Sequence, residues 1–240
     1  MFKNEAESLL SIERTKYLFK LWNKLKDFFE VAAELLLWIG TCQGPLLMLT
    51  MVLLSDFYLV WKPALFAFLP GSDYKAAFIQ AKREVAEFFR FHIKFWHKHE
   101  IKGFDRIPSQ GGALIVYYHA PIPIDYLGLV TRTYLEKGRL IRSIIDKNMI
   151  MMPGAETLIK TFGSMPGGRE DVIKLLKDGH LVGVAPGGGY EAQLATKDYP
   201  VMWKQRKGFA VVAKEAGVPI IPMFTENIRE TYCNMQSGRK

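Results

Sequence analysis

Twenty consecutive residues without a charge, close to the amino terminus, restrict this chain more than any other feature. Residues 35–54 read LLLWIGTCQGPLLMLTMVLL, and Gln43 is their only amide side chain. A helix of this length can cross the roughly 30 Å hydrocarbon layer of a bilayer. Because Glu5, Glu7 and Glu13 precede any apolar run, the segment does not have the form of a cleavable signal peptide. We therefore expect it to stay in the mature protein as a membrane anchor.

A second apolar stretch, residues 57–69, follows the first and is broken by Lys62-Pro63. We assign residues 31–70 to the membrane anchor, either a hairpin or one to two transmembrane helices, with a bend at Gly44-Pro45 or Ser55-Asp56. Basic residues on both flanks favour two cytosolic ends, which requires an even number of crossings or a re-entrant hairpin. The flanking basic residues are Lys16, Lys20, Lys24, Lys26, Lys75, Lys82 and Arg83.

Amphipathic segments border this anchor on both sides. Residues 1–30 repeat apolar side chains at helical spacing with lysines among them, which predicts a basic amphipathic helix in the membrane interface or an ordinary helix packed on a domain. Residues 71–100 end in FFRFHIKFWHK and predict a second interfacial helix. Nucleic-acid-binding proteins also interleave bases and aromatics, but the preceding anchor favours the membrane surface.

The net charge and the cysteine count limit the classes of binding partner. The sequence carries a net charge of +8 at pH 7 and two cysteines, Cys42 and Cys233. Two cysteines do not make a disulfide framework or a zinc site, and the histidines have no spacing typical of a metal site. With a membrane segment present, the positive charge indicates the anionic surface of the lipid bilayer or an acidic co-substrate such as acyl-CoA, and no nucleic acid.

From about residue 100 short apolar runs alternate with segments of helical periodicity. This alternation is typical of an α/β domain with a mostly parallel sheet and flanking helices, and we assign residues 101–240 to it. The predicted strands are ALIVYY from residue 113, LIRSIID from 140, LVGVAP from 181 and VPIIPMF from 218. The predicted helices cover residues 123–137, 151–162, 168–178 and 206–216.

Loops that follow strands carry the sites of α/β domains, and the first such loop runs from His119 to Asp125. Pro121 and Pro123 fix the backbone between them. A carboxylate bonded to one imidazole nitrogen fixes the tautomer and leaves the other nitrogen as a general base. Plain turn chemistry explains the same residues, with His119 ending a strand and Asp125 capping a helix. Both interpretations stay open, and His119 and Asp125 are candidate catalytic residues.

Two glycine-rich loops follow. GSMPGGRE, residues 163–170, resembles a phosphate loop but lacks its Lys-Ser/Thr pair, so a nucleotide-hydrolysing site is not indicated. Its turn N–H groups from Gly163 onward and the Arg169 guanidinium are candidates for binding an anion; the alternative is a capped turn with a surface arginine.

APGGGYEA, residues 185–192, is the second glycine-rich loop. Pro186, followed by Gly187 and Gly188, lets the backbone approach a ligand closely, and Glu191 is expected to point into the same region. The sequence has no G-x-S-x-G motif, and neither glycine loop pairs a serine or cysteine with a base. A covalent nucleophile is therefore not indicated.

Taken in order, HAPIPID, GSMPGGRE, APGGGYEA and VPIIPMF resemble the four sequence blocks of the glycerolipid acyltransferase (PlsC-like) superfamily. Those blocks are a His-x4-Asp block, a block ending in arginine, a Pro-Glu-Gly block and an apolar block with proline. The resemblance covers residues 35–232. It extends to an endoplasmic-reticulum branch, the transmembrane protein 68 group, which is related to diacylglycerol acyltransferases, through YYH, PIDY and RKGF and the segment AKEAGVPIIPMFTENIRE.

The resemblance implies an acyltransferase of the endoplasmic-reticulum membrane with its domain in the cytosol. His119, polarised by Asp125, would take the proton of an acceptor hydroxyl, whose oxygen attacks the thioester of acyl-CoA; backbone N–H groups near the glycine loops would stabilise the oxyanion. No bound cofactor is implied, since acyl-CoA is a co-substrate. The implied substrate-binding residues are Gly163, Arg169, Pro186, Gly187, Gly188, Glu191 and Pro222.

Three departures from the family pattern qualify these expectations. Five residues, not four, separate His119 from Asp125. Gly187 stands where the phosphate-using members carry glutamate, which favours a neutral acceptor, mono- or diacylglycerol, and triacylglycerol synthesis. The sequence stops at Lys240, where family members continue, so we expect a fragment or a shortened isoform. Two alternatives stay open: a lysophospholipid or glycerol-phosphate acyltransferase, and a catalytically inactive membrane-shaping protein.

Overall fold

Four short apolar strands form a parallel sheet in the order β2-β3-β1-β4. The computed structural model describes residues 44–69, 71–150 and 154–231 of the chain. The strands are β1 (Ala113–Tyr117), β2 (Ile141–Ser143), β3 (Leu181–Val184) and β4 (Ile220–Met223). In register, Leu114 pairs with Val182 of β3 and with Ile220 of β4. Each strand lies within a predicted one, and the α/β class with a parallel sheet is confirmed.

One face of the sheet is covered by α7 (Arg169–Lys177) and α9 (Gly208–Ala216). Alternate side chains of β1, such as Leu114 and Val116, point to this face and pack with Val172, Leu176 and Val212. Because successive side chains of a strand point to opposite faces, the remaining β1 residues are left for the other side. All five residues of β1 are buried, which is why the strand reads as a continuous apolar run.

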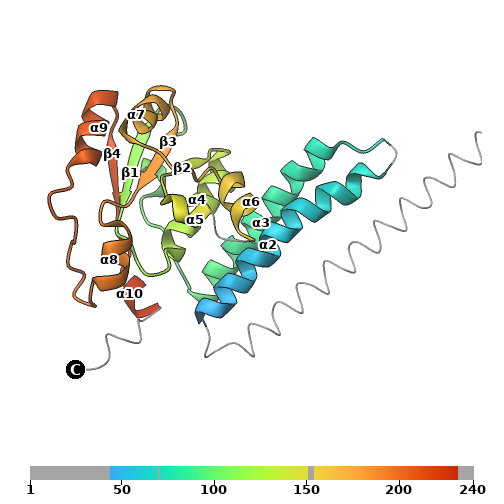
Figure 1. Cartoon of the computed structure of the whole chain (residues 1–240), viewed down its shortest axis with the longest axis horizontal. Coiled ribbons are helices and arrows are strands. Elements are labelled where there is room, and N and C mark those ends of the chain that lie inside the picture. The colour runs from blue at the N-terminus through green and yellow to red at the C-terminus, as the bar shows by residue number, and fades with distance from the viewer. Residues whose placement is uncertain (1–43, 70, 151–153, 232–240) are drawn as a thin grey trace, which may run out of the picture.

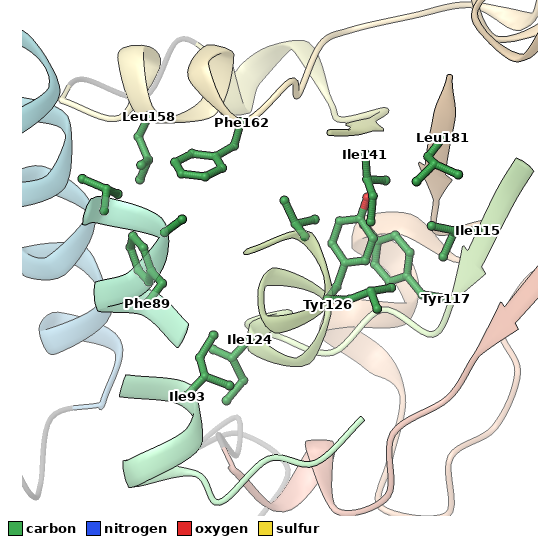
Figure 2. Close-up of a cluster of buried hydrophobic side chains, with 14 of the residues drawn as sticks. Phe89, Ile93, Ile115, Tyr117, Ile124, Tyr126, Ile141, Leu158, Phe162 and Leu181 are labelled. Carbon is green, nitrogen blue, oxygen red and sulfur yellow. The ribbon is translucent and has the colours of Figure 1, made fainter. Parts of the chain in front are cut away.

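The other face packs against α4 (Ile124–Lys137), which lies between the sheet and the helices α2 and α3 (Figure 1). Tyr126 of α4 stacks on Tyr117 of β1 with ring centroids 3.9 Å apart (Figure 2). The Tyr126 hydroxyl lies 2.7 Å from Ser143 Oγ. A Cβ at Gly183 would collide with the Tyr126 ring. Tyr126 therefore explains the glycine inside the strand LVGV.

The helices α2 (Gly44–Ala67) and α3 (Tyr74–Trp96) form a hairpin that leans away from the sheet (Figure 1). Asp73 begins α3 by accepting the Lys75 N–H at 2.8 Å, a normal N-cap. The helix α2 begins at Gly44 and continues through Ser55-Asp56, so the chain does not leave the helix at Ser55-Asp56, where a bend was expected. Residues 1–43, with the predicted amphipathic helix 1–30, lie outside the described residues.

The remaining elements are short. They are η1 (Phe104–Arg106), α5 (Lys147–Ile150), α6 (Glu156–Thr161), α8 (Gly188–Leu194) and α10 (Ile228–Thr231). Of these, α8 grows out of the glycine-rich loop 185–192, where the sequence analysis expected only a loop. The division of the chain at residues 30, 70 and 100 stays a prediction.

Candidate active site

Three loops meet at the carboxyl edge of the sheet because β1 lies between β3 and β4. The chain leaves β1 towards His119, leaves β3 towards Pro186, and leaves β4 towards the turn before α10. Carboxyl ends of parallel strands share one edge, which is the usual location of a ligand site in such sheets. The order of the strands thus places the first and third predicted loops side by side.

The imidazole of His119 is half-buried and oriented by its own neighbour. Nδ1 lies 2.7 Å from the main-chain oxygen of Ala120. A carbonyl only accepts hydrogen bonds, so Nδ1 carries the proton and Nε2 is the acceptor nitrogen of the neutral ring. This tautomer is the one a general base needs on the Nε2 side.

Asp125 does not share a hydrogen bond with the His119 ring. The carboxyl is 3% exposed, and its Oδ1 has no hydrogen-bond partner. Burial raises the pKa of Asp125 above its ordinary value, while a hydrogen bond from Thr225 and the nearby His99 oppose this shift. The tautomer-fixing role predicted for Asp125 is thus filled by the Ala120 carbonyl in this structure, and the catalytic role of Asp125 stays a prediction.

Asp125 instead lines a cavity of about 550 Å³ between the segment 97–107 and β4. Pro222 belongs to β4, opposite Val116 of β1 in the ladder, and lines the same cavity. The structure therefore brings Asp125 and Pro222 together. His119 is not part of this lining.

The Glu191 carboxylate is directed at the main chain of the His119 loop. It is fully buried; Oε2 accepts the His119 N–H at 2.9 Å, and Oε1 accepts the Met202 N–H at 3.1 Å. A buried carboxylate needs such donors to replace its lost hydration. The structure thus brings the predicted residues Glu191 and His119 together through the backbone of His119.

Gly187, directly before α8, makes room for that carboxylate. A Cβ at Gly187 would collide with the Glu191 side chain. Gly188 has a φ of +53°, in the left-handed region, and lies beside the Arg206 guanidinium. Arg206 donates to the carbonyls of Pro186 and Gly187 at 2.8 and 3.1 Å. The sequence predicted that these glycines let a ligand approach the backbone. At Gly187 the close approach of the Glu191 side chain already explains the glycine.

Arg169, the first residue of α7, lies at a separate small cavity of about 260 Å³. Pro186 and Arg206 line the same cavity, whose floor includes Val172 and Phe209. The Arg169 guanidinium is exposed and pairs with Glu215 of α9 at 2.6 Å. Two arginines at the mouth of an apolar cavity suit an anionic ligand with an apolar body.

Gly163 is placed apart from Arg169 although both come from one predicted loop. Its φ is +82°, and it packs against the side chain of Arg142 on β2. This conformation favours glycine and closes the turn after α6. The turn therefore explains why residue 163 is a glycine, without any contact to a ligand.

Arg206 and Arg229 are two residues that the sequence analysis missed. Arg206 begins the segment RKGF, and Arg229 lies in a polar segment after the last strand. Arg229 is 5% exposed, and its guanidinium reaches the main-chain oxygen of His119 at 3.2 Å. The signals in the sequence were the resemblance of RKGF, which contains Arg206, and of TENIRE, which contains Arg229, to the transmembrane protein 68 branch; neither assigned a role to the arginine.

Comparison with known proteins identifies the family of this chain. The sequence profile of the family described as Acyltransferase matches residues 98–226. The chain belongs to the acyltransferase family. The matched acyltransferase segment encloses His119, Arg169 and Glu191, and Arg229 follows it by three residues.

Relatives of this acyltransferase chain include the bovine protein named "DGAT1/2-independent enzyme synthesizing storage lipids", 34% identical over 97% of this chain and 71% of that protein. The human protein of the same name is 40% identical over 66% of this chain and 49% of its own length. The chain thus spans about half the length of the human relative. A solved 1-acyl-sn-glycerophosphate acyltransferase, PlsC from Thermotoga maritima, is 19% identical over 72% of each chain, with a TM-score of 0.45.

Proposed function

We propose that the chain transfers a fatty acyl group from acyl-CoA to a hydroxyl of a neutral glycerolipid, mono- or diacylglycerol, at the endoplasmic-reticulum membrane. The observation that carries the proposal is the Nδ1 contact between His119 and the Ala120 carbonyl, because it makes Nε2 the basic nitrogen. Family membership supplies the reaction class, and the names of the bovine and human relatives support a storage-lipid product.

The proposed reaction is a direct transfer. Nε2 of His119 takes the proton of the acceptor hydroxyl as its oxygen attacks the thioester carbonyl carbon. The carbon–oxygen bond forms, the carbon–sulfur bond breaks, and the imidazolium returns the proton to the CoA thiolate. A positioned base of this kind contributes about 10²–10⁴-fold in rate. Asp125 is proposed to favour the imidazolium through its charge.

Two features support an uncharged acceptor and an anionic donor. Gly187 takes the place of a glutamate found in phosphate-using members, and its site is filled by the Glu191 side chain. Arg169 and Arg206 flank a different cavity, where we propose that they contact the phosphates of CoA. The exposed Arg169–Glu215 pair contributes little to stability and can open for such a ligand.

The hairpin supports action at a membrane surface. Within the described residues, Met48–Ala67 of α2 is long and apolar enough to cross a bilayer, with a mean hydropathy of 1.3. Its polar side chains face the protein, since Asp56 accepts the Leu158 N–H at 2.6 Å and the fully buried Lys62 pairs with Glu84 of α3. The outward face of α2 exposes Leu49, Leu53, Leu54, Phe57, Val60, Trp61 and Leu65, and the exposed Phe68 follows the helix directly.

Because α3 and α6 cover the polar side of α2, we propose that the α2–α3 hairpin enters one leaflet and stays attached to the domain. An independent span would expose the buried charge of Lys62 to lipid, which costs several kcal/mol. The domain then sits on the cytosolic surface, where acyl chains and neutral glycerolipids are within reach.

The function is tested by reconstituting the 240-residue chain in vesicles and supplying labelled acyl-CoA with diacylglycerol, monoacylglycerol or lysophosphatidate. We expect labelled neutral glycerolipid and little labelled phosphatidate. Preferential labelling of phosphatidate would support the lysophospholipid alternative, and vesicle binding without any labelled lipid would support the membrane-shaping alternative.

A further inference from the structure

Glu191 and Arg229 are two charged side chains buried beside the loop that carries His119. Burying a charge destabilises a fold unless hydrogen bonds replace its hydration. A pair of apolar side chains would fill the same space with a smaller loss of folding free energy. The presence of two buried charges therefore needs an explanation. Their contacts supply it: both side chains bond to the main chain of residue 119.

The backbone of His119 needs such partners because β1 ends at Tyr117. Beyond the last ladder position, the N–H and C=O of residue 119 have no neighbouring strand to pair with. Glu191 accepts the N–H at 2.9 Å from α8, and Arg229 donates to the C=O at 3.2 Å from α10. The two peptide groups that flank the Cα of His119 are thus held by side chains 72 and 110 residues away.

Arg229 also ties together the elements that hold His119. Its Nε donates to the Tyr118 hydroxyl at 3.0 Å, and Nη1 donates to the Ala192 carbonyl at 3.1 Å. Nη2 donates to the Glu191 carbonyl in addition to that of His119. The planar fork of a guanidinium holds several acceptors in fixed directions, which the single ammonium of a lysine cannot do.

Both oxygens of the Glu191 carboxylate are used as acceptors, one by His119 and the other by Met202. A glutamine at this position keeps the shape but offers one oxygen and one NH2 group. The NH2 group would face a main-chain N–H, so one of the two bonds is replaced by a donor facing a donor. Glu191→Gln therefore disturbs the contact without creating a cavity.

We propose that Glu191 and Arg229 are positioning residues for the acyl transfer, which act by fixing the main chain of His119 from both sides. This inference rests on the proposed function. It assigns Glu191 a role through His119 in place of the substrate contact expected from the sequence. A displacement of a catalytic group by about 1 Å can lower the rate about 10²-fold, so a loosened loop reduces turnover although substrate binding persists.

The test compares Glu191→Gln and Arg229→Lys with a matched control, Arg139→Lys. Arg139 also donates to three main-chain carbonyls, those of Pro108, Gly111 and Gly179, but at the amino edge of the sheet. We expect kcat to fall about 10–100-fold in the two site variants, with KM for both substrates within about two-fold. Arg139→Lys loses thermal stability but keeps kcat per folded molecule.

A second readout separates positioning from general stability. Each variant is combined with His119→Ala, and the residual transfer rate is measured with labelled acyl-CoA. A residue that acts through the imidazole causes no further loss once the imidazole is gone, whereas independent effects multiply. We expect Glu191→Gln and Arg229→Lys to leave the residual rate of His119→Ala unchanged. A further ten-fold loss in the double variants, or equal kcat in Arg229→Lys and Arg139→Lys, overturns the inference.

If Arg229→Lys does not fold, Tyr118→Phe replaces it, since this variant removes only the acceptor of Arg229 Nε. We expect a smaller fall in kcat, about two- to five-fold for one weakened hydrogen bond, and an unchanged kcat overturns the part of the inference that concerns Arg229. Failure of the proposed function looks different: the unaltered chain then forms no acyl ester, or forms it equally well without His119.

Discussion

Glu191 Oε2 accepts the main-chain N–H of His119 at 2.9 Å, although 72 residues separate the two in sequence. This bond connects the glycine-rich loop after β3 with the histidine loop after β1. It also explains why the two loops belong to one site, since the carboxylate that organises the first loop ends on the backbone of the second.

The glycine at position 187 provides a direct test of that connection. A Cβ in Gly187→Ala would collide with the Glu191 side chain and push the carboxylate from the His119 N–H. We expect kcat to fall by about ten-fold or more, measured as acyl transfer per folded molecule. Gly189→Ala is the matched control, because a Cβ there meets no atom within 4 Å. Equal rates in the two variants would contradict the steric account.

Asp125→Asn is expected to raise the melting temperature at neutral pH while lowering activity. Burial raises the pKa of Asp125 in the folded protein, so the folded state binds the proton more tightly than the unfolded state. Stability is then lost as pH rises from the unfolded value of about 3.9 through the folded value. The stabilisation by asparagine should therefore be largest at pH 7 and fade near pH 4. A melting temperature that falls at pH 7 would show that the carboxylate is satisfied in the fold.

Arg169 and its partner Glu215 give a pair of variants that separate ligand binding from stability. Both Arg169→Ala and Glu215→Ala break the exposed ion pair, at a cost below about 1 kcal/mol. Only Arg169→Ala removes a cation from the cavity near Pro186. We expect it to raise KM for acyl-CoA about ten-fold, the value of one charge-assisted hydrogen bond, in steady-state assays. A matching rise in Glu215→Ala would assign the effect to the fold.

The outward face of α2 is expected to enter the lipid. Trp61 is 48% exposed and stacks on Phe57. A Trp61→Cys variant, with Cys42 and Cys233 changed to serine, can carry an environment-sensitive dye. We expect its emission to shift to the blue on addition of vesicles, while the same dye on Val211→Cys of α9 stays in water. Water-like emission from position 61 in vesicles would remove this face from the membrane.

Local patterns in the sequence predicted the elements better than the site. The runs around Leu114, Val182 and Ile221 are apolar because their strands are covered or paired, and such runs are visible without a structure. The helix α8 was missed because it begins inside a run of three glycines, of which Gly187 makes room for the Glu191 side chain. A glycine-rich string alone does not reveal which side chain fills the space beside it.

Spacing alone also left the orientation of side chains undetermined. It placed His119 after a strand and Asp125 at the start of a helix, which the structure has. It could not show that the imidazole bonds to Ala120, because the spacing of residues does not fix the rotamer of a side chain. Arg229 was beyond prediction for another reason: its role depends on contacts with residues up to 111 positions away.

The transfer rate of His119→Ala, compared with His180→Ala in vesicles containing diacylglycerol and labelled acyl-CoA, tests the central claim most directly. His180 lies just before β3 at the opposite edge of the sheet. Removing the base should lower the rate about 10²–10⁴-fold, while the His180 variant keeps the rate of the unaltered chain. Equal product from both variants would contradict a catalytic role for the His119 imidazole.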